Sequence, residues 1–218
     1  GKGMFIDVSQ QESAVALIGG HVLEYQMTGQ EPERAGNRSA VYAPHNAYPC
    51  AGDDRWVTIA VSSDQQWRRL AGNIGGPELA ADGRFATLSA RLQHEDALDR
   101  IITVWTKDKD AYEICHRLQD SQIPASPVLR GPDLLSDPHY ADRGTFETID
   151  HPQVGPRRYP GIAWKMSATP GEVRWPSPTL GQHNRQIYGD LLGMDREEID
   201  TMEERGLIGT RPTKSRII

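Results

Sequence analysis

Residues 55–70, RWVTIAVSSDQQWRRL, combine a strand pattern, a helix start and a helix in one short stretch. The first part is rich in β-branched and aromatic residues, which predicts a strand over 55–61. Ser63 and Gln66 then form an S-x-x-Q pattern, in which each side chain can satisfy a backbone N–H at the start of a helix. We therefore predict a helix over 64–74 that ends at the glycine pair following it.

Helical and strand patterns also occur on both sides of this stretch. Apolar residues at helical spacing, two of them after further cap patterns, predict helices over 10–27, 88–105, 108–120, 182–192 and 196–205. Further strands are predicted over 4–8, 145–151 and 161–167, the last two joined by the proline-rich turn 151–160. The middle of the chain therefore indicates an α+β fold.

The flanking segments predict pieces of a second domain. Residues 29–54 and 166–179 lack a sustained period and contain many turn residues, so we interpret them as linkers. They separate a strand–helix piece of a large domain at 1–28, a small α+β domain at 55–165, and C-terminal helices of the large domain with a tail at 180–218. A strand and a helix are not a stable unit alone, so we interpret the flanks as pieces of an incomplete α/β domain.

Composition argues against several classes of partner. A net charge of −6 does not favour nucleic acid, since the one basic cluster is the tail at 211–216. No apolar run approaches the roughly 18 residues that would cross a membrane. Cys50 and Cys115 lack the spacing of metal ligands, which predicts free thiols and a cytoplasmic protein.

The sequence contains none of the familiar short catalytic motifs. The polar residues of the 28–54 segment are the best candidates for a functional site. No phosphate-binding glycine loop, nucleophile elbow or paired histidine on a helix occurs, so we expect no metal and no bound cofactor. Arginines in this segment could bind a carboxylate or a phosphate through bidentate hydrogen bonds. Ser62 and Ser63 are interpreted as helix caps rather than nucleophiles. Taken alone, the residues favour a linker with solvated charges.

Several blocks in order carry a resemblance to a known family. They include GKGMFIDVS at 1–9, TGQEPERAGNRSAVYAPHNAYPC at 28–50, RWVTIAVSSDQQWRRL at 55–70, LQDSQIPASPVL at 118–129 and PTLGQHNRQIYGDLLGMDREEI at 178–199. Together they resemble the class III CoA-transferases, the CaiB/BaiF family that includes formyl-CoA and carnitine CoA-transferases. The resemblance covers residues 1 to about 208.

This resemblance implies a fold and an assembly. Family members have a large Rossmann-like α/β domain built from both chain ends, a small α+β domain between long linkers, and two chains that interlock as rings. This chain is similar to the C-terminal portion only. The expected partner is therefore a second copy in a homodimer, or a missing N-terminal half on a companion chain.

The resemblance also implies a reaction. The substrates are an acyl-CoA and a carboxylic acid, with coenzyme A as substrate rather than bound cofactor. An aspartate attacks the thioester, forms a mixed anhydride and then an aspartyl-CoA thioester, from which the acceptor carboxylate takes CoA. The family's aspartate lies upstream of the segment that matches 1–3, so no aspartate here is assigned this role. We expect the chain alone to be inactive.

Four residues are predicted to line the active-site opening, because the family loop that matches 34–48 lies near it: Asn37, Arg38, Ala43 and Pro44. Two alternatives stay open. One is a relative of the 2-methylacyl-CoA racemases, although Ser63 occupies the position where some of these carry a glutamate. The other is a non-catalytic or truncated subunit that binds a partner chain.

Overall fold

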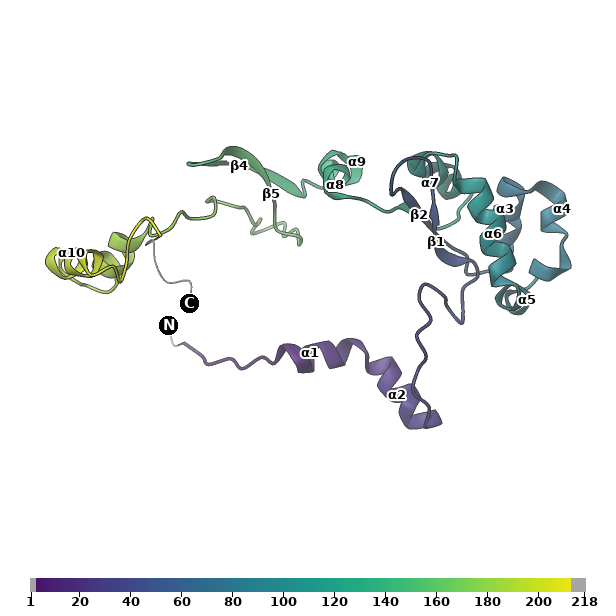
Figure 1. Cartoon of the computed structure of the whole chain (residues 1–218), viewed down its shortest axis with the longest axis horizontal. Coiled ribbons are helices and arrows are strands. Elements are labelled where there is room, and N and C mark those ends of the chain that lie inside the picture. The colour runs from purple at the N-terminus through teal and green to yellow at the C-terminus, as the bar shows by residue number, and fades with distance from the viewer. Residues whose placement is uncertain (1–2, 213–218) are drawn as a thin grey trace. The chain divides into compact units, whose positions relative to one another are not determined.

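The computed structural model describes residues 3–212 and divides the chain into two compact units, Gly1–Val128 and Leu129–Ile218 (Figure 1). Both units mix helices with a small antiparallel sheet, so the α+β fold class is confirmed. The division falls inside the block predicted as the small domain, and the predicted domain boundaries stay a prediction. Of the basic tail, residues 213–216 lie outside the described residues.

The first unit contains a three-stranded sheet in the order β1-β2-β3. Strand β1 is His45–Pro49, β2 is Trp56–Ala60 and β3 is Ala125–Pro127, and both pairings are antiparallel. Both edge strands end in a proline, which is tolerated because an edge strand has one side without ladder partners. The linker predicted over 29–54 therefore contains a strand. The prediction missed β1 because HNAYP has no β-branched residue and ends in proline.

A group of helices follows β2 in the chain, and the last two of them before β3 contact the sheet. The helices are α3 (Asp64–Ile74), α4 (Gly76–Ala80), α5 (Leu88–Gln93), α6 (Glu95–Thr106) and α7 (Ala111–Asp120), with one 3₁₀ turn at Gly83–Phe85. Alternate residues of β2 point toward them, so Val57 and Ile59 are buried with Trp67, Leu70 and other apolar side chains in one core. Cys50 and Cys115 are buried in this unit and are not joined in a disulfide, as predicted.

The helix start at Ser63 is confirmed, with one change of partner. The Gln66 N–H donates to Ser63 Oγ over 3.2 Å, while Gln66 Oε1 accepts from the Ser62 N–H over 2.9 Å. The helix predicted over 88–105 is divided at His94, whose backbone leaves the helical region between α5 and α6.

The first residues of the chain form two exposed helices, α1 (Gln10–Leu17) and α2 (Gly19–Thr28). The Ser9 cap is confirmed, but the helix predicted over 10–27 breaks at Ile18, and the strand predicted over 4–8 is not formed. A strand needs a neighbour to accept its backbone hydrogen bonds, and residues 4–8 pair with no described segment. No side chain of α1 or α2 is buried.

The second unit is built around a hairpin of β4 (Phe146–His151) and β5 (Gly155–Pro160). Strand β4 is as predicted. The strand predicted over 161–167 is wrong, because β5 occupies the segment taken for a turn. Its prolines at both ends are compatible with a two-stranded hairpin, in which each strand has a free edge. The remaining helices are α8 (Gly131–Ser136), α9 (Pro138–Asp142), a π-helix at Gln186–Leu191 and α10 (Arg196–Glu204), so the helix predicted over 182–192 is shorter.

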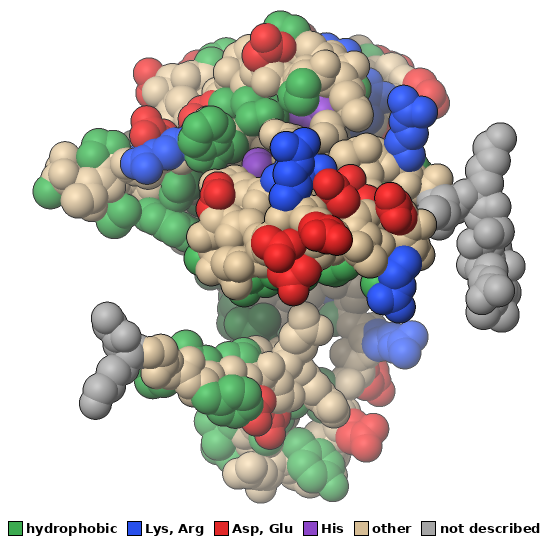
Figure 2. Space-filling view, turned by 90° about the vertical axis from the view of Figure 1, so that its left-hand side faces the viewer, with side chains coloured by type: hydrophobic (Ala, Val, Ile, Leu, Met, Phe, Trp, Pro, Cys, Tyr) green, Lys and Arg blue, Asp and Glu red, His purple; other side chains and the backbone are tan. Residues whose placement is uncertain are grey.

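Burial is uneven along the chain. Apart from Ile199, the buried apolar residues of the described chain lie between Ala43 and Ala125. Elsewhere large apolar side chains are open to solvent, and Figure 2 shows them among acidic groups on one face. Phe5 is 91% exposed and Leu17 is 89% exposed. Within residues 3–212, no helix combines the length and apolar character needed to cross a bilayer.

The first testable prediction concerns the part of the chain that folds alone. We expect residues 36–128 to fold cooperatively as an excised fragment, because they contain nearly all of the buried apolar residues. Thermal unfolding followed by circular dichroism should show one sigmoidal transition. The fragment 129–212 is the comparison and should show no sigmoidal transition. A non-cooperative melt of 36–128 would contradict the prediction.

Candidate functional site

The loop between α2 and β1, residues 29–44, is fastened near its end to β1 by hydrogen bonds. His45 Nδ1 lies 2.6 Å from the backbone oxygen of Asn37. The Asn37 amide donates to Asn46 Oδ1 over 3.1 Å, and the same oxygen accepts the Ala47 N–H over 2.8 Å. The loop therefore returns along the edge of the sheet.

Arg38 binds carboxylates, but they belong to the N-terminal part of α6. Its guanidinium contacts Glu95 and Asp96, each at 2.5 Å, and lies 3.6 Å from Asp99. The hydrogen bond to Glu95, followed by the charges of the three acids, raises the pKa of Arg38 further above its ordinary value. Arginine was expected to meet a carboxylate here, and in this structure the carboxylates are the protein's own.

Asp99 extends this cluster into the sheet. Its two carboxylate oxygens accept from the Tyr48 hydroxyl at 2.7 Å and from the Asn46 amide at 3.1 Å. Burial, together with this hydrogen bond, raises the pKa of the Tyr48 hydroxyl well above its ordinary value. The acid is thereby committed to holding β1 against α6.

Ala43 and Pro44 lie under the loop as buried residues. The Ala43 N–H donates to the Val61 oxygen and the Val61 N–H donates to the Pro44 oxygen, over 3.2 and 2.9 Å, which continues the pairing beyond β1. The carbonyl of Ala43 accepts from Arg91 Nε at 2.7 Å. These contacts fix the point where the loop enters the sheet.

Arg91 is fully buried and joins three segments. Besides Ala43 it donates to the Phe85 carbonyl at 3.0 Å and to Asp64 Oδ1 at 2.9 Å. Its guanidinium also lies over the Trp67 ring, 5.7 Å from the centroid. Each of its polar contacts satisfies a group that burial would otherwise leave costly.

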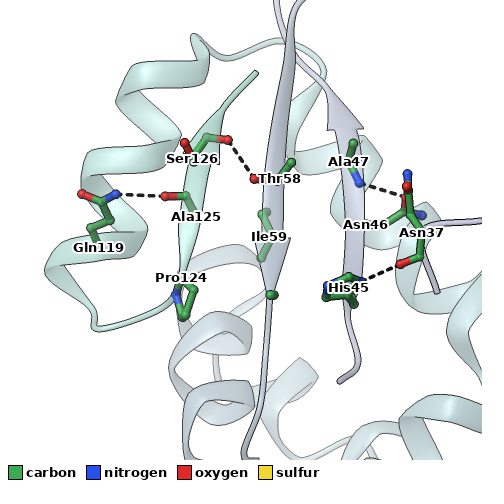
Figure 3. Close-up of a pocket in the computed structure, with 11 residues that line it drawn as sticks. Asn37, His45, Asn46, Ala47, Thr58, Ile59, Gln119, Pro124, Ala125 and Ser126 are labelled. Carbon is green, nitrogen blue, oxygen red and sulfur yellow. Dashed lines mark hydrogen bonds between the residues drawn. The ribbon is translucent and has the colours of Figure 1, made fainter. Parts of the chain in front are cut away.

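A hollow of about 510 Å³ lies on the sheet beside this loop (Figure 3). Ala47, Thr58 and Ser126 lie opposite one another on β1, β2 and β3, and all three line it. Asn37 and His45 border it on the β1 side, and Gln119 of α7 borders it beyond β3. Its lining contains no Lys, Arg, Asp or Glu.

Comparison with known proteins shows the family of this chain. Residues 1–184 match the family model described as CoA-transferase family III. The chain belongs to that family. The resemblance inferred from the sequence blocks is thereby confirmed.

Two relatives within CoA-transferase family III show the extent of the similarity. The chain is 37% identical to the succinyl-CoA–D-citramalate CoA-transferase of Chloroflexus aurantiacus, over 95% of this chain and 52% of that protein. It is 30% identical to the formyl-CoA:oxalate CoA-transferase of Streptomyces coelicolor, over 95% of this chain and 54% of the relative. The chain thus spans about half the length of the curated relatives it matches.

A solved CaiB/BaiF structure supports the fold. The protein from Brucella suis superposes with a TM-score of 0.73 at 29% identity, and the match covers 87% of this chain and 48% of that one. A structure from Mycobacterium tuberculosis at 20% identity, with a TM-score of 0.63, shows the same fold.

The four residues predicted for the opening have different surroundings in this family member. Asn37 lines the hollow, and Arg38 lies beside it in the acidic cluster, while Ala43 and Pro44 are buried at the sheet entrance. That they line an active-site opening stays a prediction. Nothing in the sequence selects Thr58, Gln119 and Ser126, because they come together only when β2, β3 and α7 pack in the folded unit.

Metal ligation finds no support in the described part of this family member. Residues 3–212 contain no group of three or more histidine, cysteine, aspartate or glutamate side chains that could hold a metal ion. The acids next to the hollow are engaged by Arg38, Tyr48 and Asn46 instead.

The second prediction tests the Arg91 contacts. Replacing Arg91 with Met should lower the free energy of unfolding by about 2–4 kcal/mol, because the buried carbonyls of Ala43 and Phe85 lose their donor. Denaturant titration measures the change. Arg84→Met is the matched control, since the Arg84 side chain is exposed in its pair with Asp82 and its loss should leave the midpoint unchanged. Equal effects of the two variants would refute this role.

The third prediction concerns alkaline pH. Because the pKa of Tyr48 is raised in the folded state, the protonated hydroxyl favours folding. This contribution is complete below the ordinary tyrosine pKa of 10.0 and is lost as the pH rises above it. We expect Tyr48 to ionise only as the chain unfolds, and Tyr48→Phe to weaken the alkaline loss of stability. Phenolate absorbance and circular dichroism, recorded together, test this, and Tyr48 ionisation in the folded state would disprove it.

Proposed function

We propose that this chain is part of an enzyme that moves CoA from an acyl-CoA to a carboxylic acid. The observation that supports this most is the match of residues 1–184 to CoA-transferase family III. The relatives' names describe transfer from succinyl-CoA to citramalate or between formyl-CoA and oxalate. The substrates of this protein are therefore proposed as a class, an acyl-CoA donor and a carboxylic acid acceptor.

The proposed reaction uses an aspartyl intermediate. A carboxylate oxygen attacks the thioester carbonyl and expels the CoA thiolate, giving a mixed anhydride; the thiolate then attacks the aspartyl carbonyl and releases the donor acid. The acceptor carboxylate attacks the resulting aspartyl thioester and expels the CoA thiolate, which then attacks the acceptor side of the new anhydride. This yields the new acyl-CoA and restores the aspartate.

We propose that this aspartate lies outside the chain. Glu95, Asp96 and Asp99 form a cluster that reaches the lining residue Asn46 through Asp99, and each acid contacts Arg38. The oxygens of these acids are engaged by Arg38, so an attack on a thioester would require breaking that contact. Their arrangement therefore suits a structural role.

The missing group would come from a companion chain, an N-terminal extension or a second copy. Exposed apolar side chains of α1 and α2 support a further partner, since such surfaces are usually covered in assemblies. Succinyl-CoA–L-malate CoA-transferase of Chloroflexus aurantiacus has alpha and beta subunits, each similar to this chain. We further propose that residues 3–28 and 180–212 complete a Rossmann-like domain in that assembly, and that Asn37, Arg38, Ala43 and Pro44 face its active-site opening.

Racemisation is the weaker proposal. The position at which some racemases carry a glutamate is occupied by Ser63, whose Oγ accepts the Gln66 N–H at the start of α3. A capping hydroxyl does not exchange an α-proton. A purely scaffolding subunit would need no substrate contact at all, and activity measurements separate it from the transferase.

The fourth prediction is the activity test. This chain mixed with an N-terminal companion should form a new acyl-CoA from succinyl-CoA and a carboxylic acid, and each part alone should not. Liquid chromatography with mass spectrometry detects the product, and borohydride trapping detects the aspartyl thioester on the companion. In deuterated water the transferred acyl group should gain no deuterium at its α-carbon. Deuterium uptake without transfer would favour a racemase, and no turnover in any mixture would favour a scaffold.

A further inference from the structure

The floor of the hollow is formed by small side chains. Ala47, Thr58 and Ser126 lie in register across the three strands, and Ala60 follows on β2. Two larger residues of these strands, Val57 and Tyr48, are buried in the core instead. A volume of about 510 Å³ falls in the range of sites for small molecules, roughly 300–1,000 Å³.

The charges around the hollow do not favour an anionic ligand. Its lining has no basic or acidic side chain. The nearest charged cluster has one arginine, Arg38, against the three carboxylates of Glu95, Asp96 and Asp99. A carboxylate or phosphate bound here would lose water without gaining a counter-charge, which is unfavourable. The hollow therefore suits an uncharged group.

His45 gives the hollow a defined hydrogen-bonding character. The Asn37 carbonyl can only accept, so His45 Nδ1 carries the proton in their 2.6 Å contact. In the neutral ring Nε2 then keeps a lone pair, and no described residue donates to it. A ligand at this rim therefore needs a hydrogen to donate.

The opposite rim also favours a ligand that donates a hydrogen bond. The Gln119 amide nitrogen donates to the Ala125 carbonyl at 2.9 Å, which leaves Gln119 Oε1 as an acceptor. On the floor, the Thr58 hydroxyl donates to the Ser126 carbonyl at 3.1 Å. The side-chain groups that remain open to a ligand are thus mainly acceptors above an apolar floor.

We propose that this hollow binds the uncharged acyl chain of a CoA thioester that carries a hydroxyl group, with His45 Nε2 accepting the hydroxyl hydrogen. The thioester part of this inference rests on the proposed CoA-transferase function. Shape and charge select a short uncharged chain, and the fixed proton of His45 selects the hydroxyl. His45 is thereby a specificity-determining residue, in contact with the substrate but outside the transfer step.

Two small thioesters test the proposal on the full chain. S-(3-hydroxybutyryl)-N-acetylcysteamine and S-butyryl-N-acetylcysteamine differ only in the hydroxyl, so their shared amide does not affect the comparison. Titration is followed by ¹H–¹⁵N correlation spectra in mildly alkaline buffer, in which a histidine ring is ordinarily neutral. We expect shifts at the amides of Ala47, Thr58 and Ser126, and about five- to ten-fold tighter binding of the hydroxylated compound, as one hydrogen bond provides.

Variants assign this preference to His45. His45→Phe retains a ring beside Tyr42 but has no acceptor, so both compounds should bind equally weakly. His116→Phe, on α7 and outside the lining, is the matched control and should keep the preference. The same spectra show whether each variant is folded.

Three results would overturn the proposal: shifts only at other amides, equal affinity for the two compounds, or a preference that survives in His45→Phe. Neither probe contains CoA, and no companion chain is present. A negative binding result therefore leaves the transferase proposal intact, and an inactive enzyme mixture leaves the binding result intact.

Discussion

The buried guanidinium of Arg91 is the contact on which the arrangement of the site depends. It binds the Ala43 carbonyl where the loop enters the sheet, the Phe85 carbonyl, and Asp64 in the first turn of α3. Burying a charge is costly unless its hydrogen bonds are satisfied, so these segments must come together for Arg91 to be accommodated. The cost of burial thereby favours one position of the loop.

Two further interactions connect this loop position to the site. Arg38 ties the loop to the acids of α6, and Asp99 ties the same helix to Tyr48 and Asn46 on β1. With β1 held at both points, Asn37 and His45 are brought to the edge of a floor made of small residues. The hollow therefore depends on how an edge strand is fastened as well as on the small side chains of its floor.

The parts predicted correctly from sequence depend on local signals. The strand–cap–helix order of β2 and α3, the caps at Ser9 and Asp195, and strand β4 follow from neighbouring residues. The failures depend on distant partners. Strands β1 and β5 have prolines and few β-branched residues, and each forms because another strand offers its backbone. In the same way Arg38 looked like a ligand for substrate, because the sequence does not show that α6 places three acids beside it.

The acids of α6 also bear on the proposed chemistry. Glu95 and Asp96 anchor the loop through Arg38, and moving either of them to attack a thioester would release the loop. One carboxylate cannot both hold the loop in place and act as the nucleophile. If this chain shapes the acyl pocket while these three acids serve packing, the proposed attacking aspartate would come from a surface that meets the hollow from outside. The proposed split between a chain that selects the acyl group and a partner that supplies the nucleophile follows from this constraint.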